Sequence, residues 1–273
     1  METSPTPQRS SLGARLLRAS PLIVGAPLLA LLLLPTLTLA LSLPAASWLW
    51  SSEASGAHTA LWLSLKSCLI SLTVMVFMGT PLAWWLAQSR GRITKLLALL
   101  ITAPLFLPPS IVGLTLLEAT SRDGWLTSLL GGVMSDPPSL AFSYSAVIIA
   151  QLTVSAPLYV LGAVVTFREL SQTLIDEARC LGATSAQAWA RVSLPLTLPS
   201  LAVALSLAGA RALGEFGATL LFAGNLPGHT QTAPLAMYLE LDRGVQGALA
   251  LSIGLLCYAI PLLGGLAYLG RRG

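Results

Sequence analysis

The chain has 273 residues, of which 55% are hydrophobic and only 10% are charged, and its net charge is +4. Ordinary soluble domains carry about 25% charged residues, so this composition cannot supply a fully solvated surface and excludes a soluble enzyme. The excess of basic residues does not indicate a nucleic-acid partner, because these residues flank apolar segments, as is typical of membrane helices. We therefore expect an all-α polytopic membrane protein.

Six apolar segments are long enough to cross a bilayer, since a spanning helix needs about 20 mostly apolar residues. None of them alternates between apolar and polar residues, as the strands of a membrane barrel would. In chain order they occupy residues 21–43, 61–87, 93–117, 141–166, 196–224 and 247–269. The sequence thus predicts six transmembrane helices.

The N-terminal part divides into two predicted segments ahead of the core. Residues 1–20 are rich in Ser, Pro and Arg and are expected to form a disordered cytoplasmic tail. Residues 21–56 are expected to form an extra helix and an outer loop, which leaves residues 57–273 as the core. Arg15 and Arg18 before a leucine-rich run also resemble a signal peptide, but the length of the run favours a retained helix.

The third predicted span is irregular, because it contains Pro104, Pro108 and Pro109. Each proline removes an amide donor and interrupts regular helix pairing. Non-helical backbone at membrane depth is tolerated only against protein or beside a water-filled cavity. Two interpretations stay open: a kinked packing helix, or a break that lines a transport pathway.

The distribution of basic residues predicts the orientation. Arg122 and Arg243 lie in loops on one side, and Lys66 and Arg211 lie within spans. The other eleven of the 15 basic residues fall on the opposite side: Arg9, Arg15, Arg18, Arg90, Arg92, Lys95, Arg168, Arg179, Arg191, Arg271 and Arg272. Because basic residues accumulate on the cytoplasmic side, both termini and the loop at residues 168–195 are predicted to be cytoplasmic.

That loop, called the docking loop below, is predicted to contain two short helices. An apolar stripe is expected at Leu170, Leu174, Ala178 and Leu181, with Asp176, Glu177 and Arg179 on the polar side. Gly182 can adopt the left-handed conformation that ends a helix. Ser185 suits the N-cap of a second helix at residues 186–192, and Pro195 is expected to begin the next span, since a residue before proline avoids helical angles.

The docking loop resembles the signature of permeases of ATP-binding-cassette (ABC) importers. In that family a Glu-Ala-Ala triplet is followed after three residues by Gly, and nine residues later by Ile-x-Leu-Pro. The matching residues here are Asp176, Glu177, Ala178, Gly182, Leu194 and Pro195. The departures are Asp for the family's Glu, Glu for its first Ala, and Val192 for its Ile. The resemblance implies that the helix ending at Gly182 is a coupling helix that inserts in a groove of a separate ATPase subunit.

Residues 209–238 resemble the fifth span and following loop of molybdate-type permeases. The matching segment contains an Arg-x-Leu-Gly-Glu-Phe-Gly-Ala-Thr run, an Asn-x-Pro-Gly turn and an Ala-Met-Tyr triplet. Sulfate permeases share the Gly-Glu-aromatic-Gly core, so sulfate, thiosulfate or tungstate remain alternatives to molybdate. The residues assigned to the pathway or its gate are Pro108, Pro109, Arg211, Gly214, Glu215, Gly217, Thr219 and Asn225.

The charged pair in the fifth span has two interpretations. Arg211 and Glu215 are four residues apart and so share one helix face, and charges within a span are costly unless they pair or face water. The pair is either a structural brace or an element of a gate. Gly214 and Gly217 would allow close backbone approach, while the polar groups of Thr219 and Asn225 are either hydrogen-bonding groups of the pathway or solvated ends.

The resemblance also implies partners: a homodimer, a cytoplasmic ABC ATPase dimer that binds ATP and Mg, and an extracytoplasmic oxyanion-binding protein. The chain itself contains no phosphate-binding Gly-x4-Gly-Lys-Ser/Thr loop, so we expect no cofactor, no metal and no enzymatic activity of its own. Cys68, Cys180 and Cys257 have no metal-ligand spacing and are interpreted as packing residues. An ion-coupled secondary transporter is the alternative from another class, but it predicts repeated halves that the sequence lacks.

Overall fold

The computed structural model describes residues 12–51, 54, 56–89, 91–131, 140–170 and 172–270. Over these residues the chain forms helices and turns, without a β-strand. It divides into two compact units, residues 1–45 and 46–273, each of which is described by itself.

The first unit contains helix α1 (Leu12–Leu41). Its apolar part, Val24–Leu41, is 18 residues long and has a mean hydropathy of 2.2, so it matches the first predicted span. The helix begins within the segment that was predicted to be a disordered tail, because Leu12, Leu16 and Leu17 are good helix formers. Residues 1–11 of that tail lie outside the described residues.

The second unit contains the other predicted spans. One continuous span runs over Ala57–Gln88 and comprises α2 (Ala57–Val74), the π-helical turn η3 (Met75–Gly79) and α3 (Thr80–Gln88). The wider π-turn precedes Pro81, whose ring would clash with the backbone of a regular helix. Further spans are α7 (Tyr144–Glu169), the Ser185–Leu213 helix that ends in α10 (Leu194–Leu213), and α13 (Val245–Leu269).

The third predicted span is broken, as its prolines indicate. Helices α4 (Arg92–Phe106) and α5 (Pro109–Ala119) meet at an angle of 114°. Between them Leu107 and Pro108 are extended, because the residue before a proline is excluded from the helical region. Among the described residues, five helices are long and apolar enough to cross a membrane, and there are six such spans when the bent pair is counted as one. The predicted all-α architecture with six spans is confirmed.

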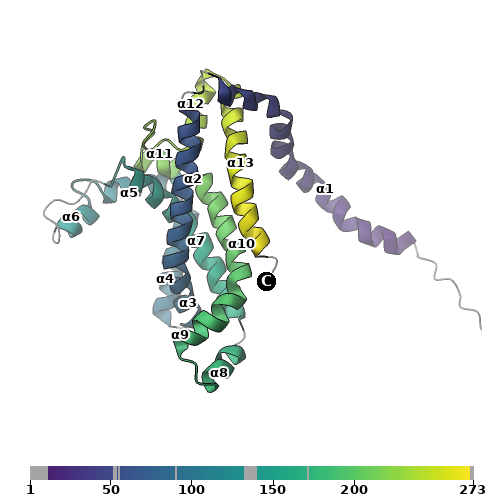
Figure 1. Ribbon diagram of the computed structural model, residues 1–273, viewed down its shortest axis with the longest axis vertical. Helices are drawn as coiled ribbons and strands as arrows, with labels where there is room; N and C mark the ends of the chain where they lie inside the picture. Colours follow the sequence, from purple (N-terminus) through teal and green to yellow (C-terminus); the bar gives the residue numbers. More distant parts are fainter. Residues whose placement is uncertain are drawn as a thin grey trace, which may run out of the picture. The chain divides into compact units, whose positions relative to one another are not determined.

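The core of the second unit lies where α10 packs against α7, α2 and α13. Figure 1 shows these helices running lengthwise beside one another. Small side chains fill the contact: Cys68, Ala208 and Ala212 are fully buried, next to Tyr159 and Leu213. In a membrane, where lipid is as apolar as leucine, such small residues allow the close packing that holds helices together.

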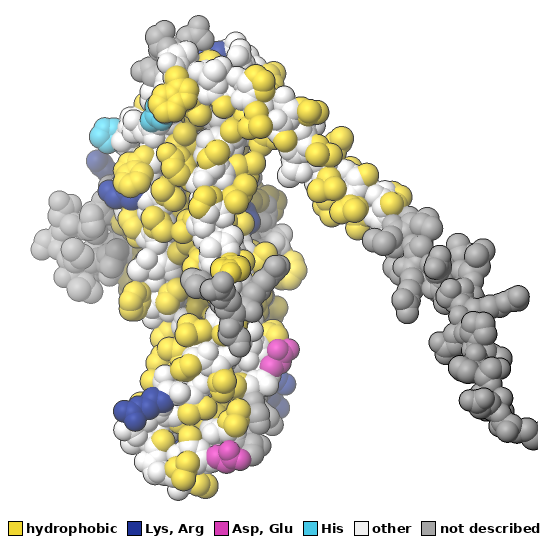
Figure 2. Space-filling view, turned by 45° about the vertical axis from the view of Figure 1, so that its right-hand side comes forward, with side chains coloured by type: hydrophobic (Ala, Val, Ile, Leu, Met, Phe, Trp, Pro, Cys, Tyr) yellow, Lys and Arg dark blue, Asp and Glu magenta, His cyan; other side chains and the backbone are white. Residues whose placement is uncertain are grey.

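Short helices lie at the two opposite ends of this unit (Figure 1). At one end lies α12 (Ala233–Arg243), and at the other lie α8 (Gln172–Cys180) and α9 (Ser185–Ala188). We call these the α12 end and the α8 end. On the face visible in Figure 2, hydrophobic side chains extend along the unit, and the described acidic side chains gather toward the α8 end.

Candidate functional site

The docking loop folds as two helices joined by a glycine turn, as predicted. Helix α8 ends at Cys180, and Gly182 has a φ of +89°, in the left-handed region that glycine adopts without steric cost. The N-cap of the second helix is Thr184, not the predicted Ser185. The Thr184 hydroxyl accepts from the Gln187 amide at 3.3 Å, and the Gln187 side chain accepts from the Thr184 amide at 2.9 Å. This reciprocal pair is a capping box, which Ser185 cannot form because the residue three positions later is Ala188.

The apolar stripe predicted for the first docking helix is not buried. Ile175, outside that stripe, is the residue that the chain covers, with 7% of its surface exposed, whereas Leu174 is 42% and Leu181 90% exposed. Helix α8 turns another face toward the following π-helical turn and leaves Leu174 and Leu181 exposed. Asp176 and Glu177 are exposed, and with Cys180 and Leu181 they line a surface hollow. The docking loop therefore presents a mixed acidic and apolar surface at the α8 end.

The loop continues into the next span without the predicted break at Pro195. Leu194 is helical, with φ −62° and ψ −50°, and the helix runs unbroken from Ser185 to Leu213. The π-helical turn η4 (Trp189–Ser193) precedes the proline, and its wider hydrogen-bonding ring gives the proline room, as π-turns elsewhere accommodate irregular backbone. The second docking helix is thereby a continuous extension of α10.

The break between α4 and α5 lies against a second break, which the sequence did not predict. The fifth span was expected to continue to Gly224, but α10 ends at Leu213 and a separate helix, α11, runs from Gly217 to Phe222. A Cβ atom on Gly217 would lie 3.0 Å from the Ser110 amide nitrogen and 3.4 Å from Pro109. The predicted pathway residues Pro108, Pro109 and Gly217 are therefore brought together where two broken segments meet.

Helices α5 and α11 approach each other closely next to these breaks. A Cβ on Gly113 would lie 2.6 Å from the Ala218 carbonyl oxygen, a contact that no larger residue can make. Gly214 has no such neighbour, because its Cβ would lie 3.5 Å from the nearest atom, the Ala210 carbonyl oxygen. Close approach within this chain thus requires glycine at Gly113, leaves little room for a side chain at Gly217, and does not require glycine at Gly214.

The predicted pairing of Arg211 and Glu215 is present. The guanidinium lies 2.6 Å from the Glu215 carboxylate, and the carboxylate also accepts a hydrogen bond from the Ala218 amide at 2.7 Å. The Glu215 side chain is 1% exposed and that of Arg211 is 30% exposed. Glu215 therefore ties the end of α10 to the start of α11 across the break at Gly214, and it neutralises Arg211. Thr219 is buried, and its hydroxyl has no hydrogen-bond partner among the described residues.

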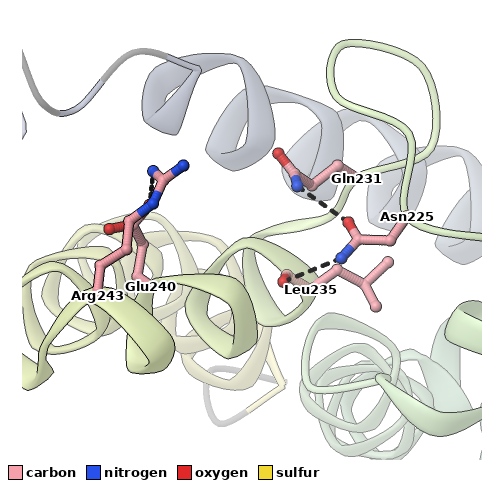
Figure 3. A network of polar contacts seen from close by, with 5 residues as sticks. All are labelled: Asn225, Gln231, Leu235, Glu240 and Arg243. Atoms are coloured by element: carbon pink, nitrogen blue, oxygen red, sulfur yellow. Dashed lines mark hydrogen bonds and ion pairs between the residues drawn. The ribbon is translucent and has the colours of Figure 1, made fainter.

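Asn225 organises the loop at the α12 end (Figure 3). Its side chain accepts from Gln231 at 3.0 Å and donates to the Leu235 carbonyl at 3.5 Å. The predicted turn at residues 227–228 is present, with Gly228 at a φ of +77°. Figure 3 also shows the Arg243–Glu240 pair, 2.9 Å apart, further along α12. Asn225 thus acts within the loop fold, rather than as an isolated polar end of a span.

A buried polar network between α2 and α7 was missed in the sequence. The Gln151 amide donates to the Ser67 hydroxyl at 3.1 Å and accepts from Ser71 at 3.0 Å, and all three residues are buried. One turn earlier, the Ser64 hydroxyl accepts from the Ala233 amide of α12 at 2.7 Å. The signal was available, because serines at 64, 67 and 71 recur at helical spacing, and Gln151 interrupts an apolar run.

The described residues offer no metal site, since they contain no group of three His, Cys, Asp or Glu that could hold an ion. The cysteines do not share one role. Cys68 is buried, as a packing residue should be, but Cys180 and Cys257 are exposed in this chain.

Comparisons with known proteins agree with this architecture. Residues 79–272 match the family described as "Binding-protein-dependent transport system inner membrane component". The chain is 42% identical to the molybdenum transport system permease protein ModB of Mycobacterium tuberculosis over 204 residues, which cover 74% of this chain and 75% of that protein. It is 36% identical to ModB of Escherichia coli K12, over 71% of this chain and 85% of that protein.

Solved structures share the fold. A bacterial ABC transporter that imports the acidic polysaccharide alginate contains a chain with a TM-score of 0.73 and 18% identity, covering 96% of this chain and 98% of that one. The MetNI methionine ABC transporter gives a TM-score of 0.59 at 18% identity, covering 81% of this chain and 96% of that one. With the family match over most of the chain, these findings identify a multi-pass membrane component of a transport system: the chain belongs to the family of binding-protein-dependent transport system inner membrane components.

Proposed function

We propose that this chain is the permease subunit of an ATP-driven molybdate importer. Two copies would form the translocation pathway, a separate ABC ATPase dimer would supply the energy, and an extracytoplasmic binding protein would deliver the anion. The observation that carries the proposal is the docking loop: a short helix with exposed acidic and apolar side chains, a left-handed glycine, and an unbroken continuation into α10.

The geometry of this loop suits a mechanical coupling element. Leu181 is 90% exposed next to Asp176 and Glu177, so a partner can bury an apolar side chain and pair with the carboxylates. The second docking helix continues into α10 without a break. A displacement at the docking loop would therefore pass into a span whose far end carries Arg211, Glu215 and the break before α11.

Molybdate is favoured among the oxyanions because the relatives that are 42% and 36% identical are named as molybdenum transport permeases. The segment at residues 209–238, where the molybdate-type resemblance lies, forms the broken helix end, the Asn225 loop and the start of α12. Tungstate and sulfate are tetrahedral dianions of the same charge, so the binding protein would select among them. The pathway would need only weak, charge-based attraction.

The proposed orientation places the α8 end in the cytoplasm. Described basic residues at or near that end include Arg168, Arg179 and Arg191, in agreement with the accumulation of basic residues on the cytoplasmic side. The α12 end would then face the binding protein.

The test uses the docking glycine. A Cβ on Gly182 would meet nothing within 4 Å, so Gly182→Trp projects its ring away from this chain and into the space a partner would occupy. Gly182→Ala is the matched control, because it carries the same backbone strain at positive φ without the bulk. We expect the tryptophan variant to insert in the membrane but to lose co-purification with the ATPase and ATP-dependent molybdate uptake, while the alanine variant keeps both. Normal assembly and uptake by Gly182→Trp would refute the proposed coupling role.

A further inference from the structure

Two cations lie within the spans at the same depth, Lys66 in α2 and Arg211 in α10. The Cys68 thiol donates to the Gly209 carbonyl at 3.8 Å, which fixes the relative height of these two helices. Lys66 precedes Cys68 by two residues, and Arg211 follows Gly209 by two residues. Because the helices run in opposite directions, both cations are displaced toward the α12 end, by about 3 Å.

The two cations differ in their partners. Arg211 lies 2.6 Å from the Glu215 carboxylate and is neutralised by it. In the part of the chain that the structure describes, the ion pairs are Arg211–Glu215 and Arg243–Glu240, so no carboxylate pairs with Lys66. Lys66 is exposed, and its Nζ lies 5.4 Å from the centre of the Tyr144 ring. A ring face orients an ammonium without cancelling its charge, so no described carboxylate offsets the charge of the Lys66 ammonium.

The position of Tyr144 connects this charge to the broken segments. Tyr144 begins α7 and packs against a buried cluster that joins α2, α5, α7 and α11 through Leu63, Val112, Val147 and Ala218. The cluster includes residues of α5 and α11, the two helices that follow the breaks. The hydroxyl of Tyr144 is itself buried and has no hydrogen-bond partner among the described residues. Through Tyr144, the unpaired cation is connected to a cluster that includes residues of α5 and α11.

We propose that Lys66 is an anion-binding residue of the translocation pathway, where its ammonium attracts a tetrahedral oxyanion dianion at the depth of Arg211. The inference rests on the proposed function and names the residue that supplies the charge. A single ammonium is a compact point charge without the two-pronged geometry of arginine, so it attracts a dianion and releases it again. An importer needs such weak binding, because an anion held tightly within the pathway would stop transport.

The experiment measures uptake and ATP hydrolysis together, in proteoliposomes that contain the complete complex with its ATPase and loaded binding protein. The variants are Lys66→Gln, Lys66→Arg and, as the matched control, Lys95→Gln, which removes the chain's other lysine at an exposed position near the start of α4. We expect Lys66→Gln to lower the molybdate taken up per ATP hydrolysed by about tenfold, the factor that corresponds to about 1.4 kcal/mol. Lys66→Arg should restore most of the uptake, and Lys95→Gln should leave the ratio unchanged.

Three results would overturn the inference. The first is an unchanged ratio in Lys66→Gln. The second is a parallel loss of uptake, ATP hydrolysis and thermal stability, which would show that Lys66 only anchors the span. The third concerns lipid phosphate, the other source of the same chemistry. If the effect of Lys66→Gln disappears when anionic phosphatidylglycerol is replaced by phosphatidylcholine, the ligand is a lipid headgroup. Failure of the unaltered complex to take up any oxyanion would instead refute the proposed function.

Discussion

The pair formed by Arg211 and Glu215 allows a quantitative test of how the broken span is held together. Glu215 contacts two elements at once, through the 2.6 Å ion pair with Arg211 in α10 and the 2.7 Å hydrogen bond from the Ala218 amide in α11. Replacing Glu215 by Ala removes both contacts. Replacing it by Gln removes the charge but keeps an oxygen that can accept from Ala218. The two variants therefore separate the ion pair from the helix connection.

The size of the effect follows from the burial of the two partners. Removing one member of a fully buried pair costs about 3–5 kcal/mol. Arg211 is 30% exposed, so water stabilises the unpaired guanidinium in part, and we expect Glu215→Ala to lower the free energy of unfolding by about 2–3 kcal/mol. Glu215→Gln should cost about 1–2 kcal/mol, because the hydrogen bond to the Ala218 amide is retained.

The assay is thermal or denaturant unfolding in detergent of the two Glu215 variants, Arg211→Gln and the double variant Arg211→Gln/Glu215→Gln. If the pair acts as described, the double variant is more stable than the sum of the single losses predicts, with a coupling energy of at least about 1 kcal/mol. A coupling energy within the additivity error of about 0.5 kcal/mol would mean that the two charges contribute independently, and would refute the description of Glu215 as the partner of Arg211.

Three further predictions address other features. Gln151→Leu should lower the free energy of unfolding by about 1 kcal/mol in the same unfolding assay, as interhelical hydrogen bonds in membranes do; an unchanged value would show that the network with the α2 serines contributes nothing. Gly113→Ala should cost about 1–3 kcal/mol through overpacking, because its Cβ meets the Ala218 carbonyl oxygen at 2.6 Å; wild-type stability would contradict that contact. Cys180 is exposed in the docking loop, and replacing Cys257 by Ala leaves it as the exposed cysteine to be labelled. A membrane-impermeant maleimide should then label Cys180 in inverted vesicles but not in intact cells. Labelling in intact cells alone would place the docking loop on the outer side of the membrane.

Local sequence features predicted the backbone turn of the docking loop, but not which of its side chains are exposed. The glycine turn at Gly182 was predictable because only glycine adopts that φ without strain. The face that this chain covers was not predicted: Ile175 is buried, whereas Leu174 and Leu181 are exposed. Apolar spacing indicates which residues share a face, but the neighbouring segment decides which face is covered. At Thr184, the capping box depended on Gln187 three residues later, a pattern that was present in the sequence and overlooked.

In the membrane core, too, some features could be predicted from the sequence and others could not. Proline content predicted the break between α4 and α5, because prolines act on the backbone next to them. The break at Gly214 was missed, since the surrounding run is apolar enough to continue as a helix; in the fold, the Glu215 carboxylate accepts from the Ala218 amide at the start of α11. The network around Gln151 depends on residues 80 and more positions apart, a distance over which spacing carries no information.

The sequence by itself determined that this chain lies in a membrane, how many times it crosses, and which family it resembles, because apolar length, basic residues and spaced motifs are properties of contiguous segments. Only the tertiary structure decided that the two broken segments meet, that Glu215 neutralises Arg211 while Lys66 lacks a carboxylate partner among the described residues, and that Ile175 is buried while Leu181 is exposed. These outcomes depend on which helices become neighbours, and that is set by side-chain packing between segments far apart in the chain.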